Sequence, residues 1–487
     1  MAITKVTSAL LNSTALTSKA FGTSSIMIGD DATGTIDAAN YNTGLGVDVF
    51  AALTTGDGNT AVGFAVLDAT TTGGGNVGVG QHVLTGNTTG NNNTAIGHVA
   101  LGDNTTAEEN TAVGYFALNA NTTGASNTAV GSNALADNTT GASNTAVGRE
   151  ALHANTTASN NVAVGKHAMR ANTTGASNTA VGYDALLVNT TGADNTAVGK
   201  SALDANETGA SNSALGVDAL GASTTGDHNV AMGKESLTTN STGDNNTGLG
   251  NFALALNTTA SNNTAVGYSA LLANTTGTQN TAVGGKAGDS VTTGSNNTFL
   301  GHETGDSITT GSGNTLVGQG INTSATGDEK NGLGHALTCD SGYTTVGYGS
   351  ADIRAAHGTA TWATVSDERV KKDIKDSTVG LNFINDLRPV TFNYKNKSDL
   401  PTEFNGYEED STEVYKSEKS QHGFIAQEVK TAIDKHSDIK NGFSMWDADD
   451  ETGQQRVGET ALIPMLTKAI QELSAEVEEL KKQLENK

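Results

Sequence analysis

A glycine recurs every 17 residues through most of this chain, and this repeat limits the possible folds more than any other feature. The series begins at Gly29 and continues without a slip to Gly318, which makes 18 repeats. A strict period of this length is typical of a solenoid, in which each repeat forms one coil that packs only on its neighbours.

The residues of one unit indicate which kind of solenoid forms. Residues 110–126 read NTAVGYFALNANTTGAS, which is too short for two helices. Thr111-Ala112-Val113 predicts a short strand that ends at Gly114, and Ala117-Leu118 a second apolar piece. Asn121-Thr122-Thr123-Gly124 predicts a turn, because Asn and Gly tolerate left-handed backbone conformations. We therefore expect a mainly β fold with a parallel β-solenoid, β-roll-like shaft over residues 29–318, about 85 Å long at about 4.8 Å per coil.

The small inward residues of the repeat predict that the shaft is trimeric. Ala, Val and Leu dominate these positions, so one coil encloses a narrow core and a single chain buries little apolar surface. Three chains side by side would bury more. The NTAVGxxAL element resembles the head repeats of trimeric autotransporter adhesins, although the present unit is longer. The resemblance implies a trimeric parallel β-roll and leaves the cross-section of the coil open.

The two positions after each repeat glycine vary, as in Lys166-His167 and Lys234-Glu235. Stacked coils would arrange them in two ladders, one mainly basic and one mainly acidic. One interpretation is a solvated surface on which the two ladders neutralise each other. The other is a surface for a repetitive glycan, with aromatic side chains as stacking platforms: Tyr115, Phe116, Tyr183 and Tyr268.

Composition and charge exclude several functional classes. The net charge of -24 disfavours binding to nucleic acid or to an anionic membrane. No apolar stretch is long enough to span a bilayer, so no membrane insertion is expected. Cys339 is the single cysteine and is interpreted as a buried apolar residue. The N-terminus lacks the features of a secretion signal, which predicts synthesis in a cytosol. We predict no cofactor and no metal site.

Residues 366–374, SDERVKKDI, separate the repeat from a segment of ordinary composition that holds all three prolines. Ser366 and Lys371 are candidates for a serine nucleophile and its base. A serine hydroxyl attacks only when a base removes its proton, and a neutral lysine can be that base. This pair of residues alone carries little information.

Three further motifs follow in a fixed order: LNFINDLRPVTFNY at residues 381–394, HGFIAQEV at 422–429 and ALIPMLTKAIQEL at 461–473. Together with residues 366–374 they resemble the intramolecular chaperone domain of endosialidase-type phage tail proteins, over about a quarter of the chain. That domain ends phage fibres and spikes, drives trimer assembly and often cuts itself off at the Ser of its SD motif.

The resemblance implies roles for individual residues. Ser366 would be the nucleophile and Lys371 its base, in a serine peptidase that acts only on its own chain. The cut is expected between Ser366 and Asp367, with Val365–Ser366 as the alternative. No activity on an external substrate is expected. In the HGFIAQEV motif, His422 is interpreted as a packing or hydrogen-bonding residue. The chaperone residues of this motif are His422, Gly423, Phe424, Gln427 and Glu428.

The end of the chain follows a heptad pattern and predicts a coiled coil over residues 459–486. β-Branched residues at the first seam position with Leu at the second would favour a dimer. The family resemblance favours a trimer, and we expect the trimer. The predicted seam consists of Ile463, Leu466, Ile470, Leu473, Val477, Leu480 and Leu484.

The predicted domains are an N-terminal cap and virion attachment segment (1–28), the shaft (29–318), a distal tip or connector (319–365) and the chaperone (366–487). This organisation predicts a homotrimeric tail fibre or spike, located in the virion tail and made in the host cytoplasm. Its expected partners are a tail or baseplate protein and a host surface glycan or protein. The alternatives are a bacterial trimeric surface adhesin and a polysaccharide-depolymerising tailspike.

Overall fold

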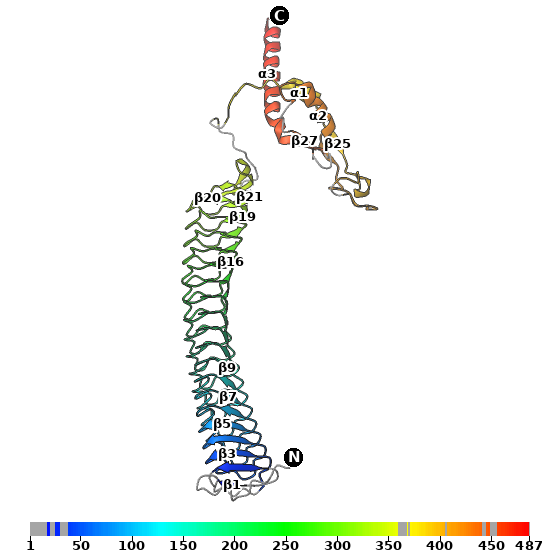
Figure 1. The fold of residues 1–487 in the computed structure, drawn as a ribbon. Helices are drawn as coiled ribbons and strands as arrows, with labels where there is room; N and C mark the ends of the chain where they lie inside the picture. Colours follow the sequence, from blue (N-terminus) through cyan, green and yellow to red (C-terminus); the bar gives the residue numbers. More distant parts are fainter. Residues whose placement is uncertain are drawn as a thin grey trace. The chain divides into compact units, whose positions relative to one another are not determined.

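The computed structural model describes residues 17–19, 25–29, 38–358, 368, 371–404, 407–440, 445–448 and 455–486. The chain divides into two compact units, residues 1–365 and 366–487. The first unit is built of strands and the second mixes short strands with helices (Figure 1). Each unit is described separately.

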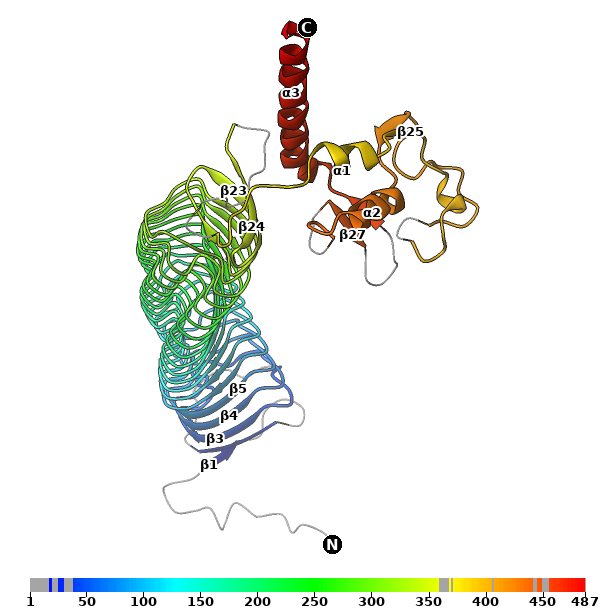
Figure 2. The same ribbon diagram turned by 90° about the horizontal axis from the view of Figure 1, so that it is seen from above.

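The first unit is a parallel β-solenoid in which each coil contributes one short strand to a single continuous sheet. Figure 2 shows the strands of successive coils superposed along one side of the stack. The strands are β1 (Thr17–Lys19), β2 (Ile26–Gly29), β3 (Thr43–Val47), β4 (Thr60–Phe64), β5 (Val77–Gln81), β6 (Thr94–Ile96), β7 (Thr111–Val113), β8 (Thr128–Val130), β9 (Thr145–Val147), β10 (Val162–Val164), β11 (Thr179–Val181), β12 (Thr196–Val198), β13 (Ser213–Leu215), β14 (Val230–Met232), β15 (Thr247–Leu249), β16 (Thr264–Val266), β17 (Thr281–Val283), β18 (Thr298–Leu300), β19 (Thr315–Gln319), β21 (Asn331–His335), β23 (Tyr343–Tyr348) and β24 (Ala351–Ala356).

The register between neighbouring strands confirms the 17-residue coil. Ile26 pairs with Thr43, and the same offset continues to the pairing of Thr298 with Thr315. Beyond that point the coils shorten: Thr315 pairs with Asn331 and Asn331 with Thr344. The parallel stack therefore continues past Gly318 through the degraded repeats that contain Gly332 and Gly347.

Within one coil the strand has one residue facing inward between two facing outward. Ala112 is fully buried, whereas Thr111 and Val113 on either side are partly exposed. The buried Ala117 and Leu118 then complete a narrow core of small and medium side chains. This arrangement confirms the predicted composition of the core.

The corners of the coil differ from the sequence expectation. Left-handed backbone occurs at Phe116, Leu118 and Ser126, with φ of 54°, 53° and 60°, and not at Asn121 or Gly124. Gly124 is needed for space instead, because a Cβ there would lie 2.2 Å from the carbonyl oxygen of Gly141 on the next coil.

Two buried columns of asparagine run along the inside of the solenoid. In the first column the backbone N–H of Asn127 donates to Oδ1 of Asn110 at 2.9 Å, and Nδ2 of Asn127 donates to the carbonyl of Gly141 at 2.9 Å. In the second column Nδ2 of Asn138 donates to Oδ1 of Asn121 at 2.9 Å. Each asparagine thus ties its own coil to the neighbouring ones.

The ends of the solenoid are covered by antiparallel strands. β1 pairs antiparallel with β2 at the start, and β24 pairs antiparallel with β23 at the end. A reversed strand satisfies the edge of the sheet that a further coil would otherwise occupy. Beside the last coils, β20 (Asn322–Thr323) and β22 (Thr338–Cys339) form a two-stranded parallel sheet.

In its described residues, the second unit packs three α-helices and two short antiparallel sheets around a small core. Its core contains Phe383, Val429, Ile433, Met445 and Leu462, all buried. The elements are α1 (Leu381–Asp386), β25 (Val390–Phe392), η3 (Lys397–Asp399), β26 (Gln421–Gly423), α2 (Ala426–Lys435), β27 (Trp446–Ala448), β28 (Gln455–Val457), η4 (Glu459–Leu462) and α3 (Ile463–Glu485).

The asparagine columns generate a test of the fold. Asn178→Ala would remove the acceptor of the Asn195 N–H and the donor to the Gly192 carbonyl, both inside the solenoid. Each orphaned buried group costs roughly 1–3 kcal/mol, so the thermal unfolding temperature of the full chain should fall clearly. Thr174→Ala, at an exposed position of the preceding coil, should leave it nearly unchanged. Equal melting of the two variants would show that the columns do not stabilise the coil.

Candidate functional site

The predicted nucleophile lies outside the described residues, so the Ser366–Lys371 pairing stays a prediction. Asp367, on the other side of the expected cut, is also outside them. Lys371 is described and exposed, and its backbone N–H donates to the carbonyl of Glu368 at 3.0 Å. No geometry of the proposed cleavage reaction follows from these residues.

The structure joins the second and third chaperone motifs in one pair of antiparallel strands. β25 pairs antiparallel with β26, and Thr391 is directly opposite His422. Their side chains are hydrogen-bonded, with 3.1 Å between Oγ1 of Thr391 and Nδ1 of His422. This contact fits the interpretation of His422 as a hydrogen-bonding residue. Gly423 leaves room for Glu459, since a Cβ at that position would lie 3.1 Å from Oε1 of Glu459.

An ion pair across the same two motifs fixes the start of α2 beside β25. Nε of Arg388 donates to Oε2 of Glu428 at 2.9 Å, and a second bond joins the guanidinium to Oε1. Such a bidentate pair sets both distance and orientation. The hydrogen bond from Arg388 lowers the pKa of the Glu428 carboxyl. Sequence reasoning singled out Glu428 but missed Arg388, although Arg388 lies within the quoted second motif.

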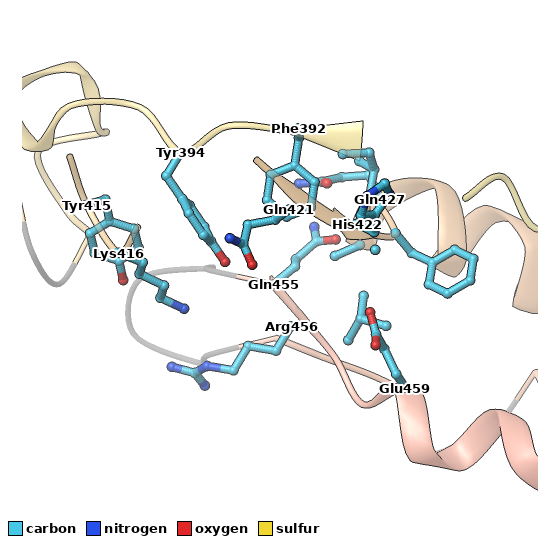
Figure 3. Close-up of a pocket in the computed structure, with 15 residues that line it drawn as sticks. Phe392, Tyr394, Tyr415, Lys416, Gln421, His422, Gln427, Gln455, Arg456 and Glu459 are labelled. Carbon is cyan, nitrogen blue, oxygen red and sulfur yellow. The ribbon is translucent and has the colours of Figure 1, made fainter. Parts of the chain in front are cut away.

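The β25–β26 pair forms one wall of an open hollow of about 740 Å³, which β28 and Glu459 close on the other side (Figure 3). Tyr394 and Tyr415 meet edge to face, with 6.1 Å between ring centroids. Nζ of Lys416 lies 5.7 Å from the first ring centroid and 5.4 Å from the second. Tyr415 and Lys416 were not predicted, because they lie in a segment without a recognisable motif. Tyr394 ends the quoted second motif, but nothing in that motif indicates the contact with Tyr415.

The remaining chaperone residues divide between this hollow and the core. Gln427 is exposed and lines the hollow. Phe424 lines it as well and also packs, partly buried, against the core of the unit. The third motif therefore links the core of the second unit to this hollow.

The predicted seam residues of α3 all lie on the surface of the chain. The exposed fraction is 67% for Ile470 and 74% for Leu484, and Ala469 is the buried residue in α3. The start of α3 is fixed by its own unit, because Oε2 of Glu472 accepts the backbone N–H of Leu381 at 2.7 Å. The helix thus has an apolar stripe that its own unit does not cover.

A second uncovered apolar surface follows the strands of the solenoid. The outward residue after the buried middle position of each strand is aliphatic or Met on every coil, and we call this row the strand-face ladder. Leu215 and Leu300 in it are 46% and 47% exposed. The ladder consists of Ile28, Leu45, Val62, Val79, Ile96, Val113, Val130, Val147, Val164, Val181, Val198, Leu215, Met232, Leu249, Val266, Val283, Leu300, Val317, Leu333 and Val346.

The described part of the chain holds neither of two other kinds of site, a membrane-spanning helix and a metal centre. None of its helices has the length and apolar character that crossing a membrane requires. Within the same residues, no three His, Cys, Asp or Glu side chains gather as a metal site would need.

Comparison with known proteins gives one finding, in the second unit. Residues 366–438 match the family model described as chaperone of endosialidase. The match includes the first three chaperone motifs and ends before α3. It supports an intramolecular chaperone in this unit. Neither the curated proteins nor the solved structures gave a match to the chain.

The Arg388–Glu428 pair predicts a pH dependence of the second unit. The pKa of Glu428 lies below its ordinary value of 4.5, so the pair stabilises the folded unit above pH 4.5 and less as the pH falls through the lowered pKa. Arg388→Met should therefore weaken the protection of the β25–β26 amides from hydrogen exchange at pH 7. The difference from the unchanged chain should shrink in acid below pH 4.5.

Lys481→Met is the matched control, because it removes an exposed ion pair with Glu478 in α3. It should leave the β25–β26 amides unaffected at both pH values. A constant effect of Arg388→Met from neutral pH into acid would mean that the arginine acts through packing and not through the charge of Glu428.

Proposed function

We propose that this protein is a homotrimeric attachment fibre or spike of a bacteriophage tail, assembled by its C-terminal unit. The observation that carries the proposal is the strand-face ladder, an unbroken apolar row on the outside of every coil. A single chain in water would leave this row exposed, and exposed apolar patches of such extent mark interaction surfaces. The match to the endosialidase chaperone and the solenoid shaft support the same class of protein.

The best partner for the ladder is another copy of the same chain. The rungs repeat at the coil spacing of about 4.8 Å, and a second copy offers the same spacing over the same length. Burying the half-exposed part of one rung contributes roughly 1 kcal/mol. Repeated along the shaft, this gain outweighs an association cost of about 4–15 kcal/mol. Three copies around one axis would cover the ladder of each chain.

The C-terminal unit is proposed to bring the three chains into register. Parallel coils have no local hairpins, so they form slowly and with a large loss of chain entropy before contacts compensate for it. A coiled coil through the uncovered α3 stripe would hold three chains together and raise their local concentration while the coils form. Folding of the shaft could then proceed from its end, coil by coil.

The other parts of the chain receive the following roles in this proposal. Residues 1–28 dock onto a tail or baseplate protein, and residues 319–365 form a distal tip. The receptor is a glycan or protein of the host surface. The fibre is made in the host cytoplasm and ends in the virion tail.

Trimer assembly should depend on the seam of α3. Replacing Ile470 and Leu473 with Asp places two charges in the seam, and buried unpaired charges are strongly unfavourable. Light scattering should give a trimer for the unchanged protein, with three times the chain mass of 49.3 kDa as long as the chain is uncut. The double variant should give monomers or aggregates.

A control pair adds the same charge outside the seam. Gln471→Asp with Ala475→Asp changes exposed positions of the same helix and should still give trimers. Soluble trimers from the Ile470/Leu473 variant would contradict the assembly role of α3. A monomeric unchanged chain would contradict the trimer itself.

We also propose that the chain cuts itself at the junction. Oγ of Ser366 would attack the adjacent backbone carbonyl while Lys371 takes its proton and passes it to the leaving amine. Water would then hydrolyse the ester. Ser366→Ala and Lys371→Ala should each stay full-length and trimeric. Mass spectrometry measures this: one stable species at the full 49.3 kDa would rule out cleavage and leave the chaperone role intact.

A further inference from the structure

We propose that a row of aromatic rings near the start of the shaft is a binding site for a linear, uncharged glycan. The row, which we call the aromatic strip, lies just after the repeat glycines of four consecutive coils. This inference rests on the proposed attachment role and names a site and a ligand class for it. The strip consists of Phe64, His82, His98, Tyr115 and Phe116.

The five rings contact one another in sequence along the stack. Phe64 meets His82 edge to face at 5.2 Å between centroids, and His82 meets His98 at 6.4 Å. His98 is stacked on Tyr115 at 5.4 Å with 14° between the planes. Phe116 closes the strip at 4.5 Å from Tyr115. Three coil spacings of about 4.8 Å give the strip a length of about 14 Å along the shaft.

The backbone holds the rings rigidly. The N–H of His82 donates to the carbonyl of Phe64 at 2.9 Å, and the N–H of Phe116 donates to the carbonyl of His98 at 3.0 Å. These bonds link neighbouring coils, so the spacing of the rings is set by the stack. A ligand that binds a preformed row of rings loses less free energy in ordering the protein.

The chemistry of the strip suits a sugar chain. Phe64 and Tyr115 are 42% and 54% exposed, so part of each ring is open to a ligand. The C–H groups on one face of a pyranose ring pack on an aromatic face, and its hydroxyls need polar partners at the edge.

The charge around the strip selects an uncharged glycan. No lysine or arginine occurs between Lys19 and Arg149, whereas Asp57, Asp68 and Glu108 lie within the same stretch. A polyanionic glycan would meet no cation there and would be repelled by the net charge of -24.

The other aromatic residues that the sequence suggested as platforms differ from the strip. Tyr183 lies beneath Nζ of Lys166 at 5.4 Å from its centroid, next to the charged residues of its neighbouring coils. Tyr268 contacts Phe252 edge to face at 6.2 Å, as a pair and not as part of a run. Tyr268 therefore provides a matched control, since it occupies the position equivalent to Tyr115 and is similarly exposed.

The test is calorimetric titration of the full chain with linear hexasaccharides. The uncharged probes are the hexamers of glucose (β1→4 and α1→4), mannose and N-acetylglucosamine, and hexagalacturonate is the charged comparison. At least one uncharged hexamer should bind more tightly than hexagalacturonate. Tyr115→Ala should weaken that binding about tenfold, Tyr115→Phe should retain it, and Tyr268→Ala should change it less than about twofold.

Light scattering and melting of each variant accompany the titrations. The proposal is wrong if no uncharged hexamer binds at millimolar concentration, if hexagalacturonate binds best, or if Tyr268→Ala weakens binding as much as Tyr115→Ala. It is also wrong if Tyr115→Ala lowers the trimer fraction, because the strip would then be a contact between copies. Any of these results leaves the attachment role standing on its own tests, whereas a monomeric unchanged chain would overturn that role first.

Discussion

The buried asparagine columns are the constraint on which the solenoid depends. A buried amide must find hydrogen-bond partners, and here the partners belong to the coil itself and to its neighbours. A slip of one coil by a single residue would place Thr111 where Asn110 must be, or Ser126 where Asn127 must be. Several amides would then lose their partners together. The 17-residue period is therefore enforced at every coil. Asn206 and Asn274 show the same rule. The next coil carries Ser223 or Val291 in place of the asparagine, and the Oδ1 atoms of Asn206 and Asn274 have no partner within the described residues.

The first column also marks where the regular coil ends. Lys330 takes the place of an asparagine, and its backbone N–H donates to Oδ1 of Asn314 at 3.0 Å. Its Nζ then donates to the hydroxyl of Ser324 at 2.8 Å, inside the structure. Burial lowers the pKa of this amine. The coil that ends just before Lys330 is one residue shorter than the regular coils, so the change in chemistry and the change in period coincide.

The sequence predicted the stacking direction, the register and the small core, because these follow from a period that repeats without error. It did not predict the corners of the coil. Leu118 adopts a left-handed backbone that leucine rarely takes by itself, and the stack imposes it through the bond from the Leu118 N–H to the Ala134 carbonyl at 2.9 Å. The change of core packing around Phe299, in contrast, could have been inferred from the sequence. Gly288 and Gly305 replace the repeat leucine on either side of Phe299, and a Cβ at Gly288 would lie 2.6 Å from that ring.

In the second unit the four quoted motifs predicted the important residues but not how those residues meet. The Arg388–Glu428 pair and the hydrogen bond between Thr391 and His422 join segments about 30 to 40 residues apart. Tertiary pairing of this kind leaves no periodic signal in a sequence. The heptads of α3 were readable because their period is local, and their exposure follows from the rest of the unit, which covers Ala469 and leaves Ile470 and Leu473 uncovered.

The strand-face ladder and the α3 stripe lie in separate units, yet they have the same unmet requirement for an apolar partner. The two repeats differ in how well they fix the register between neighbouring chains. Every rung of the ladder is chemically almost the same, so two shafts displaced by one coil would still match apolar row to apolar row, and the ladder alone selects a partner without fixing its register. The α3 seam is short and ends within one helix, so a displaced alignment loses a large share of its contacts. If three repetitive chains associate through the strand-face ladder, the α3 stripe can fix the register that the ladder leaves open, so that the chains stack without offset.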